Sequence, residues 1–175
     1  MLAPEHDVPT IYEDCWTALQ RVAAHASEKF TNANKDPWLK KYADFSRLSI
    51  IGDSAGGNIV YHMTMIAGRD GGINENVAIN GSIHAFPYLL IPIENAEQIV
   101  SYKIWTAIAP PSEAGFHSTI LIHLLKRLIG MKKSGWKEEI EFIEFKGEGH
   151  CFQMENSEEE KAQDLIKRFA SFIQT

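Results

Sequence analysis

Apolar residues recur along the first half of the chain with two different periods. From Tyr12 onward they repeat at helical spacing, which predicts an amphipathic helix. A short apolar run at 47–51 predicts a buried strand that ends at Gly52, and helical spacing returns at 59–66. The resulting order is strand, glycine-rich turn and helix, and the glycines of 68–72 end that helix.

The second half of the chain continues the alternation of strands and helices. Alternating apolar residues at 77–85 predict a second strand closed by Pro87, and the apolar residues of 140–145 predict a third strand. Helical spacing predicts three further helices, at 94–111, at 119–133 and after a capping box formed by Ser157 and Glu160. This alternation is typical of the α/β class, with a mostly parallel sheet flanked by helices.

Composition and charge narrow the classes of protein to consider. The chain has 175 residues, 45% of them hydrophobic and 23% charged, which fits one soluble domain. The net charge of -6 is spread along the chain without a basic stripe, so nucleic acid is not an expected partner. No apolar stretch reaches membrane-spanning length, and we expect a cytoplasmic protein without a membrane partner. Cys15 and Cys151 lie far apart and predict neither a disulfide framework nor a zinc site, only packing.

The glycine-rich turn, Gly52-Asp53-Ser54-Ala55-Gly56, carries the first candidate for chemistry. A serine nucleophile must be exposed, have a base beside it and have donors for the oxyanion. Gly52 and Gly56 are expected to permit a tight, strained turn that lifts Ser54 above the sheet, with Asp53 as part of that turn. The backbone N–H of Ala55 and the helix N-terminus would face the same point. An incidental serine in a glycine-rich turn is the alternative, but the strand before and the helix after favour a nucleophile.

His150 is the expected base. In this arrangement the chain order is serine, acid and histidine, and His150 follows the third predicted strand on a glycine-flanked loop. The other histidines lie inside predicted elements, near a terminus, or without a position that assigns them a role. The catalytic pair predicted from the residues is therefore Ser54 and His150.

Several motifs together resemble one known family. They are Leu2-Ala3-Pro4-Glu5-His6, Tyr12-Glu13-Asp14, Asp36-Pro37-Trp38, Gly52-Asp53-Ser54-Ala55-Gly56-Gly57-Asn58, Lys132-Lys133-Ser134-Gly135-Trp136 and Gly147-Glu148-Gly149-His150. The chain resembles the plant carboxylesterases, which are close to the hormone-sensitive lipase group and include 2-hydroxyisoflavanone dehydratases and gibberellin receptors. The resemblance implies an alpha/beta-hydrolase fold and a serine hydrolase of small apolar esters that needs no metal or cofactor.

Two features depart from the pattern of that family. Its His-Gly-Gly-Gly segment, which supplies further oxyanion donors, lies upstream of the point that Met1 occupies here. The family's aspartate projects to a point near Ser118, yet no aspartate occurs between Asp70 and Asp164, and Glu113 is too weak a substitute to assign. We therefore expect residues 1–175 to form a single, partial and internally deleted alpha/beta-hydrolase domain without an assigned catalytic acid.

Three functions follow from these expectations. The first is a carboxylesterase-like serine hydrolase whose partner is a small-molecule ester and whose activity the missing groups put in doubt. The second is a non-catalytic protein that binds a small, hormone-like molecule on the same scaffold. The third is an inert fragment. The sequence predicts neither the particular substrate nor the oligomeric state.

Overall fold

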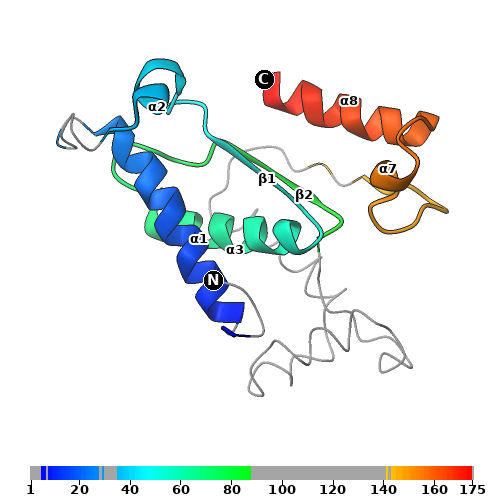
Figure 1. Cartoon of the computed structure of the whole chain (residues 1–175), viewed down its shortest axis with the longest axis horizontal. Coiled ribbons are helices and arrows are strands. Elements are labelled where there is room, and N and C mark those ends of the chain that lie inside the picture. The colour runs from blue at the N-terminus through cyan, green and yellow to red at the C-terminus, as the bar shows by residue number, and fades with distance from the viewer. Residues whose placement is uncertain are drawn as a thin grey trace.

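Two parallel strands with helices on both sides form the centre of the fold (Figure 1). The computed structural model describes residues 5–6, 8–27, 29, 35–87, 141 and 143–174. The strands are β1 (Ser49–Asp53) and β2 (Gly81–Ala85). The helices are α1 (Val8–Ala23), the 3-10 turn η1 (Ala24–Ala26), α2 (Pro37–Tyr42), α3 (Ala55–Asp70), α7 (Phe152–Glu155) and α8 (Glu160–Gln174).

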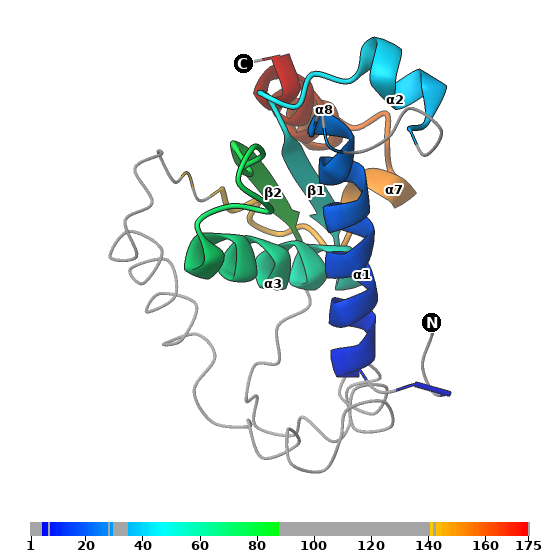
Figure 2. The same ribbon diagram turned by 90° about the vertical axis from the view of Figure 1, so that its left-hand side faces the viewer.

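The pairing of β1 and β2 confirms the α/β class and the parallel sheet. The register runs from Ser49 opposite Gly81 to Asp53 opposite Ala85, with α3 as the helix that connects the two strands. In both ribbon views α3 and α8 lie on opposite sides of the strand pair (Figures 1 and 2). Since side chains alternate along a strand, each strand contributes to both layers. The carboxyl ends of the two strands meet at one edge, directly before α3.

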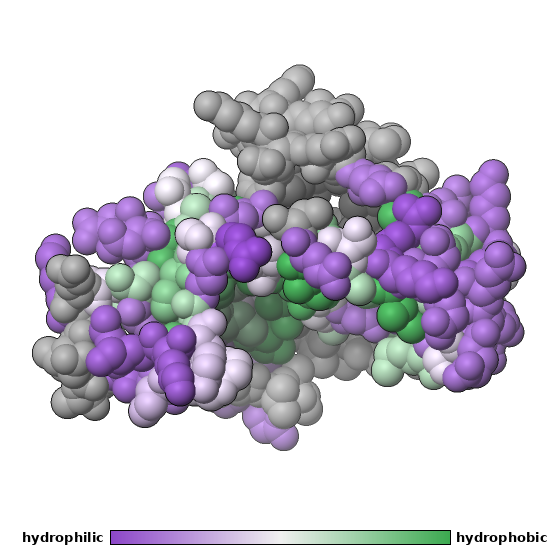
Figure 3. Space-filling view, turned by 90° about the horizontal axis from the view of Figure 1, so that it is seen from above, coloured by the Kyte–Doolittle hydropathy of each residue, from purple (hydrophilic) through white to green (hydrophobic). Residues whose placement is uncertain are grey.

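Two separate hydrophobic clusters lie between the helices and the strand region. The first joins Ala23 of α1, Ala67 of α3 and the buried residues Ile73, Val77 and Ile79, which lead into β2. The second joins Phe152 of α7 to Ala162 and Leu165 of α8. The space-filling view shows hydrophobic residues in the middle of one face, with hydrophilic residues toward both ends (Figure 3). The second cluster lies close to the candidate site described below.

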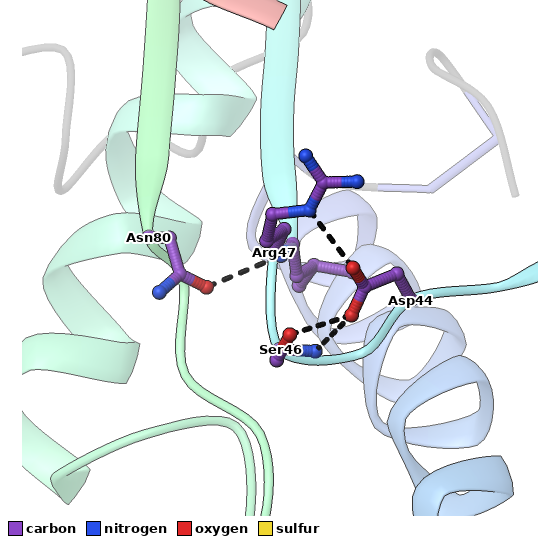
Figure 4. A network of polar contacts seen from close by, with 5 residues as sticks. Asp44, Ser46, Arg47 and Asn80 are labelled. Atoms are coloured by element: carbon purple, nitrogen blue, oxygen red, sulfur yellow. Dashed lines mark hydrogen bonds and ion pairs between the residues drawn. The ribbon is translucent and has the colours of Figure 1, made fainter. Parts of the chain in front are cut away.

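A polar network fixes the entry into β1 (Figure 4). The carboxylate of Asp44 accepts hydrogen bonds from the backbone N–H and the hydroxyl of Ser46 at 3.0 and 2.6 Å, and from Nε of Arg47 at 2.8 Å. Asn80, just before β2, accepts from the N–H of Leu48 through its side chain at 3.1 Å and donates its own N–H to the Leu48 carbonyl at 2.8 Å. These bonds set the register at the amino ends of both strands.

Contacts between α1 and α3 position the beginning of α3. The hydroxyl of Tyr12 donates to Oδ1 of Asn58 at 2.6 Å, and the ring of Tyr12 stacks on His62 with the centroids 3.9 Å apart. Asn58 lies one helical turn after Ser54, and its N–H donates to the Ser54 carbonyl at 3.2 Å. The contacts of α1 therefore help to hold the turn that carries Ser54 in place.

Some expected elements differ from the observed ones. The third strand is wrong for 141 and 143–145, which lie outside any strand, and Phe145 packs on Phe152 with ring centroids 5.3 Å apart. The capping box is also wrong, because α8 begins at Glu160 itself and Ser157 lies in a preceding turn. The helices expected at 94–111 and 119–133 lie outside the described residues. Within the described part of the chain, no helix combines the length and apolar character needed to span a membrane.

Candidate functional site

The turn between β1 and α3 holds Ser54 in an unusual backbone conformation. Ser54 has φ 54° and ψ −115°, outside the regions that side-chain-bearing residues prefer. Its N–H donates to the carbonyl of Ala85, the last residue of β2, at 2.9 Å. The turn is thus anchored to the neighbouring strand as well as to α3, and it raises Ser54 at the carboxyl end of the parallel strands.

The sequence places glycine where the turn brings backbone segments together. A Cβ on Gly52 would lie 2.1 Å from the carbonyl oxygen of Gly56, so only glycine fits at that position. Gly56 has no such steric role, because a Cβ there would meet nothing within 4 Å. That role belongs to Gly57, whose Cβ would lie 2.8 Å from the Ala85 carbonyl oxygen and 2.9 Å from Cα of Pro87.

Ser54 and His150 lie together although 96 residues separate them in the sequence. The Ser54 hydroxyl oxygen is 2.8 Å from Nε2 of His150. Ser54 occupies the N-cap position of α3, where serine commonly bonds a backbone N–H of the first turn, but its side chain makes no such bond. The hydroxyl is therefore directed to the imidazole instead of capping the helix. The structure brings together the two side chains that were predicted from the sequence as a catalytic pair.

The loop that carries His150 is held from two directions. Lys161 of α8 donates from Nζ to the carbonyl of Lys146 at 3.0 Å and forms an ion pair with Glu148. On the other side, the ring of Phe86 meets the His150 imidazole edge-on with the centroids 5.8 Å apart. Phe86 also meets the buried ring of Phe152 at 5.7 Å, so the second hydrophobic cluster supports the imidazole.

Backbone strain is concentrated at this site. Among the described residues other than glycine, positive φ occurs at Ser54, Phe86 (41°) and Cys151 (57°). Ser54 contacts His150, Phe86 packs against His150, and Cys151 follows it directly. Strained residues persist where surrounding contacts over-determine them, and they cluster at functional sites. The positive φ of Phe86 and Cys151 beside His150 adds a second structural reason to regard this region as the candidate functional site.

Asp53 and Cys151 are the sequence neighbours of the pair, since Asp53 directly precedes Ser54 and Cys151 directly follows His150. Burial, a hydrogen bond to Asp53 and the negative charges of Asp53 and Glu155 raise the pKa of the Cys151 thiol to about 11. Oδ1 of Asp53 is buried and has no hydrogen-bond partner among the described residues. The sequence prediction of simple packing for Cys151 did not include this electrostatic influence of Asp53.

The remaining predicted positions can also be located. Ala55 is the first residue of α3, so its N–H has no partner within the helix and is free to meet an anion. For the catalytic acid, no described carboxylate is hydrogen-bonded to the other ring nitrogen of His150, and Glu113 lies outside the described residues. Within the same described ranges, no group of three or more His, Cys, Asp or Glu residues is arranged to hold a metal ion.

Sequence reasoning missed several parts of this site, including Phe86 and the carbonyl of Ala85. A signal for both was present, because Phe86 and Pro87 come directly after a strand parallel to β1, and the carboxyl ends of neighbouring parallel strands meet at one edge. The influence of Asp53 on the Cys151 thiol had no comparable signal. It depends on how the loop before α7 returns to the β1 end, which local sequence patterns do not encode.

The site combines a strained serine, placed between a parallel strand and a helix, with a histidine from a distant loop. The chain is therefore an α/β protein with a serine–histidine pair at the carboxyl edge of its sheet. The chain belongs to the alpha/beta hydrolase fold family, whose sequence profile matches residues 1–114. This membership confirms the fold class predicted from the sequence.

Named relatives extend the similarity over nearly the whole chain. It is 32% identical to 2-hydroxyisoflavanone dehydratase of Glycyrrhiza echinata, 33% to Hydrolase 3 of Catharanthus roseus and 32% to Probable carboxylesterase 13 of Arabidopsis thaliana. Each comparison covers 98% of this chain and 63%, 64% and 63% of the respective relative. The chain therefore spans less than two thirds of the length of these relatives. The first alignment extends over 208 residues, more than the 175 of this chain, so that relative has residues without a counterpart here.

Proposed function

We propose that this chain acts as a serine hydrolase of the carboxylesterase type, with small, apolar carboxylic esters as substrates. The observation that carries the proposal is the 2.8 Å approach of the Ser54 hydroxyl to Nε2 of His150, made by a serine held in a strained turn. Relatives named as carboxylesterases and hydrolases support this choice of chemistry. Relatives named as dehydratase or synthase show that the fold alone does not fix the reaction.

The proposed reaction uses the groups already described. Unprotonated Nε2 of His150 takes the proton of the Ser54 hydroxyl while Oγ attacks the ester carbonyl carbon. The carbonyl oxygen becomes an oxyanion that the N–H of Ala55, at the start of α3, would stabilise. The imidazolium then gives its proton to the leaving alcohol, and an acyl-serine forms. Water, deprotonated by the same imidazole, attacks the acyl-serine and releases the acid.

Labelling with a fluorophosphonate tests the proposal directly, because this probe bonds covalently to an activated serine. The wild-type chain should be labelled, and Ser54→Ala should abolish the labelling. His150→Gln should slow labelling by about 10² to 10⁴-fold, the range that general-base catalysis contributes. Ser46→Ala is a matched control that removes another hydroxyl, from the loop before β1, and should label at the wild-type rate. Folded wild-type protein that remains unlabelled would contradict the proposal.

A second function is a small-molecule binding protein without turnover. It is favoured by one observation, that no described carboxylate reaches the other ring nitrogen of His150. In serine–histidine–aspartate sites that carboxylate orients the imidazole and stabilises its charged form, and its loss costs about 10⁴-fold in turnover. Saturable binding of a small carboxylic acid or ester by the folded chain, with neither hydrolysis nor fluorophosphonate labelling, would favour this second function.

A further inference from the structure

We propose that Lys161 is a positioning residue for His150, because it holds the loop that carries the imidazole against the first turn of α8. This inference rests on the proposed function, since it assigns Lys161 a part in the reaction of Ser54. Lys161 does not contact the reacting atoms in this scheme. It acts through two residues of the loop, which lie four and two positions before the base.

The loop that carries His150 is anchored by aromatic rings at its two ends. Phe145, before the loop, packs on Phe152, after it, with the ring centroids 5.3 Å apart. Between them lie Gly147, with φ 84°, and Gly149, and a Cβ at either glycine would meet nothing within 4 Å among the described residues. Glycine restricts the backbone least, so packing does not fix the middle of this loop. His150 directly follows Gly149, and the position of its imidazole therefore depends on polar contacts of the loop.

Lys161 makes such contacts at two points of the loop. Its Nζ donates to the carbonyl oxygen of Lys146 at 3.0 Å and to Oε1 of Glu148, with which it forms an ion pair. The two acceptors lie on either side of Gly147, in a turn where the N–H of Glu148 donates to the Phe145 carbonyl at 3.3 Å. One contact would fix a single distance, whereas two contacts from one ammonium group also restrict how the turn rotates.

The ammonium group is carried by a well-packed helix. Lys161 is the second residue of α8, and Ala162, which follows it, is 0% exposed. Ala162 packs with Leu165 and Phe152 in the second hydrophobic cluster. The beginning of α8 should therefore stay in place when the side chain of Lys161 is changed, so that only the loop loses a contact.

The burial of Glu148 explains why loss of the cation would displace the loop. The side chain of Glu148 is only 18% exposed, whereas that of Lys161 is 50% exposed. A largely buried carboxylate is costly unless it is paired, and Lys161 provides the pairing charge. Without the ammonium group, Glu148 lowers its free energy by turning toward water, and the loop turns with it. His150, two residues further on, would then leave its 2.8 Å approach to the Ser54 hydroxyl.

The first experiment measures kcat and KM for p-nitrophenyl acetate in the full chain. Lys161→Met keeps the aliphatic stem but removes the donor. It should lower kcat by about 10- to 100-fold with KM unchanged, since a misplacement of about 1 Å at a catalytic group costs about 100-fold. Lys161→Arg keeps a charged donor and should restore most of the lost kcat. Lys167→Met, on the same helix, is the matched control and should keep the wild-type kcat.

Two results of this experiment would overturn the inference. The first is a wild-type kcat in Lys161→Met, which would mean that the loop holds His150 without the lysine. The second is a kcat in Lys161→Arg as low as in Lys161→Met, because a loss that a charged donor cannot restore does not come from the tether.

The second experiment follows the loop independently of catalysis. Trypsin cleaves after Lys146, whose carbonyl is the one that Lys161 binds. Release of the loop should make this cleavage about 5-fold faster in Lys161→Met than in wild type, the factor that corresponds to a hydrogen bond of typical net strength. Cleavage after Arg69, at the end of α3, is the internal control and should keep its rate. Mass spectrometry of the fragments gives both rates. An unchanged rate after Lys146, or an equal rise at both sites, would overturn the inference.

The two experiments separate this inference from the proposed function. If wild type neither hydrolyses the ester nor reacts with a fluorophosphonate, the proposed function fails. Faster cleavage after Lys146 in Lys161→Met would then show a tether without a reaction to serve, which overturns the catalytic part of the inference. If wild type is active and Lys161→Met matches it, the inference alone fails. Circular dichroism of each variant confirms that the chain is folded.

Discussion

A Cβ on Gly52 would lie 2.1 Å from the carbonyl oxygen of Gly56, which makes the first residue of the turn intolerant of any side chain. We expect Gly52→Ala to displace the turn and abolish fluorophosphonate labelling at Ser54. The obstructing atom belongs to the backbone of α3, so no side-chain rotation can relieve the overlap. The rate of labelling and the urea midpoint of unfolding are the two measurements.

Gly56→Ala provides the matched control for that substitution. A Cβ at Gly56 would meet nothing within 4 Å, and alanine is favoured over glycine inside a helix by about 0.5–1 kcal/mol. We expect Gly56→Ala to unfold at an equal or higher urea concentration than wild type. A Gly56→Ala variant that is as destabilised as Gly52→Ala would contradict the steric account of the turn.

The sequence predicted the parts of the fold that are local in the chain. The apolar run before Gly52, the glycines of the turn and the helical spacing after it lie within about twenty residues, and all agree on strand, turn and helix. The parallel pairing of β1 with β2 also follows from this order, because a helical connection returns the chain in the same direction. The left-handed Gly71 that ends α3 was signalled by its glycine cluster.

The parts that escaped prediction depend on contacts between distant segments. The apolar residues at 143–145 have the composition of a strand, yet Phe145 packs on Phe152 instead of pairing within the sheet. Ser157 has the spacing of a capping box, but the first turn of α8 starts at Glu160. At the site, Ser54 and His150 were predictable because their chemistry requires a serine and a base. The supporting contact of Phe86 with His150 has no such requirement behind it.

Phe86 allows the cost of backbone strain to be measured at the site. Its φ of 41° is unfavourable for any residue with a Cβ, by about 1–2 kcal/mol in the left-handed region. Phe86→Ala and Phe86→Gly both remove the ring that packs on His150 and Phe152. We expect the glycine variant to be at least as stable as the alanine variant, by up to about 1 kcal/mol, contrary to the usual order of these residues. Urea unfolding measures the free energy of unfolding of both variants. A clearly more stable alanine variant would contradict the inference that the backbone of Phe86 is strained.

Asp44 should make the stability of the fold depend on pH in acid. Hydrogen bonds from Ser46 and Arg47 lower the pKa of Asp44 to about 2, whereas an unfolded aspartate titrates near 3.9. The folded chain therefore binds fewer protons than the unfolded chain between these values, so this contribution is present above about pH 4 and is lost as the pH falls toward 2. Asp44→Asn should show a smaller loss of stability over that range, and because Asp44 is exposed the difference should shrink in high salt.

Urea unfolding at several pH values between about 2 and 6 measures the contribution of Asp44. Ser46→Ala is the matched variant, because it removes the largest cause of the lowered pKa and leaves Arg47 in place. We expect its pH dependence to fall between those of wild type and Asp44→Asn. Identical acid profiles for wild type and Asp44→Asn would show that the network in Figure 4 does not contribute to stability.

Gly81 and Phe172 link β2 to α8 on the face of the strands opposite α3. A Cβ on Gly81 would lie 2.5 Å from Cζ of Phe172, the far end of a side chain. We expect Gly81→Ala to destabilise the fold by about 1–3 kcal/mol, the usual cost of overpacking.

Since the obstructing atom belongs to a side-chain ring and not to the backbone, Phe172→Leu should make room for the alanine. The double variant should then be more stable than the sum of the two single effects predicts, by at least about 0.5 kcal/mol in urea unfolding. Additive effects would mean that α8 does not pack on β2 at this point.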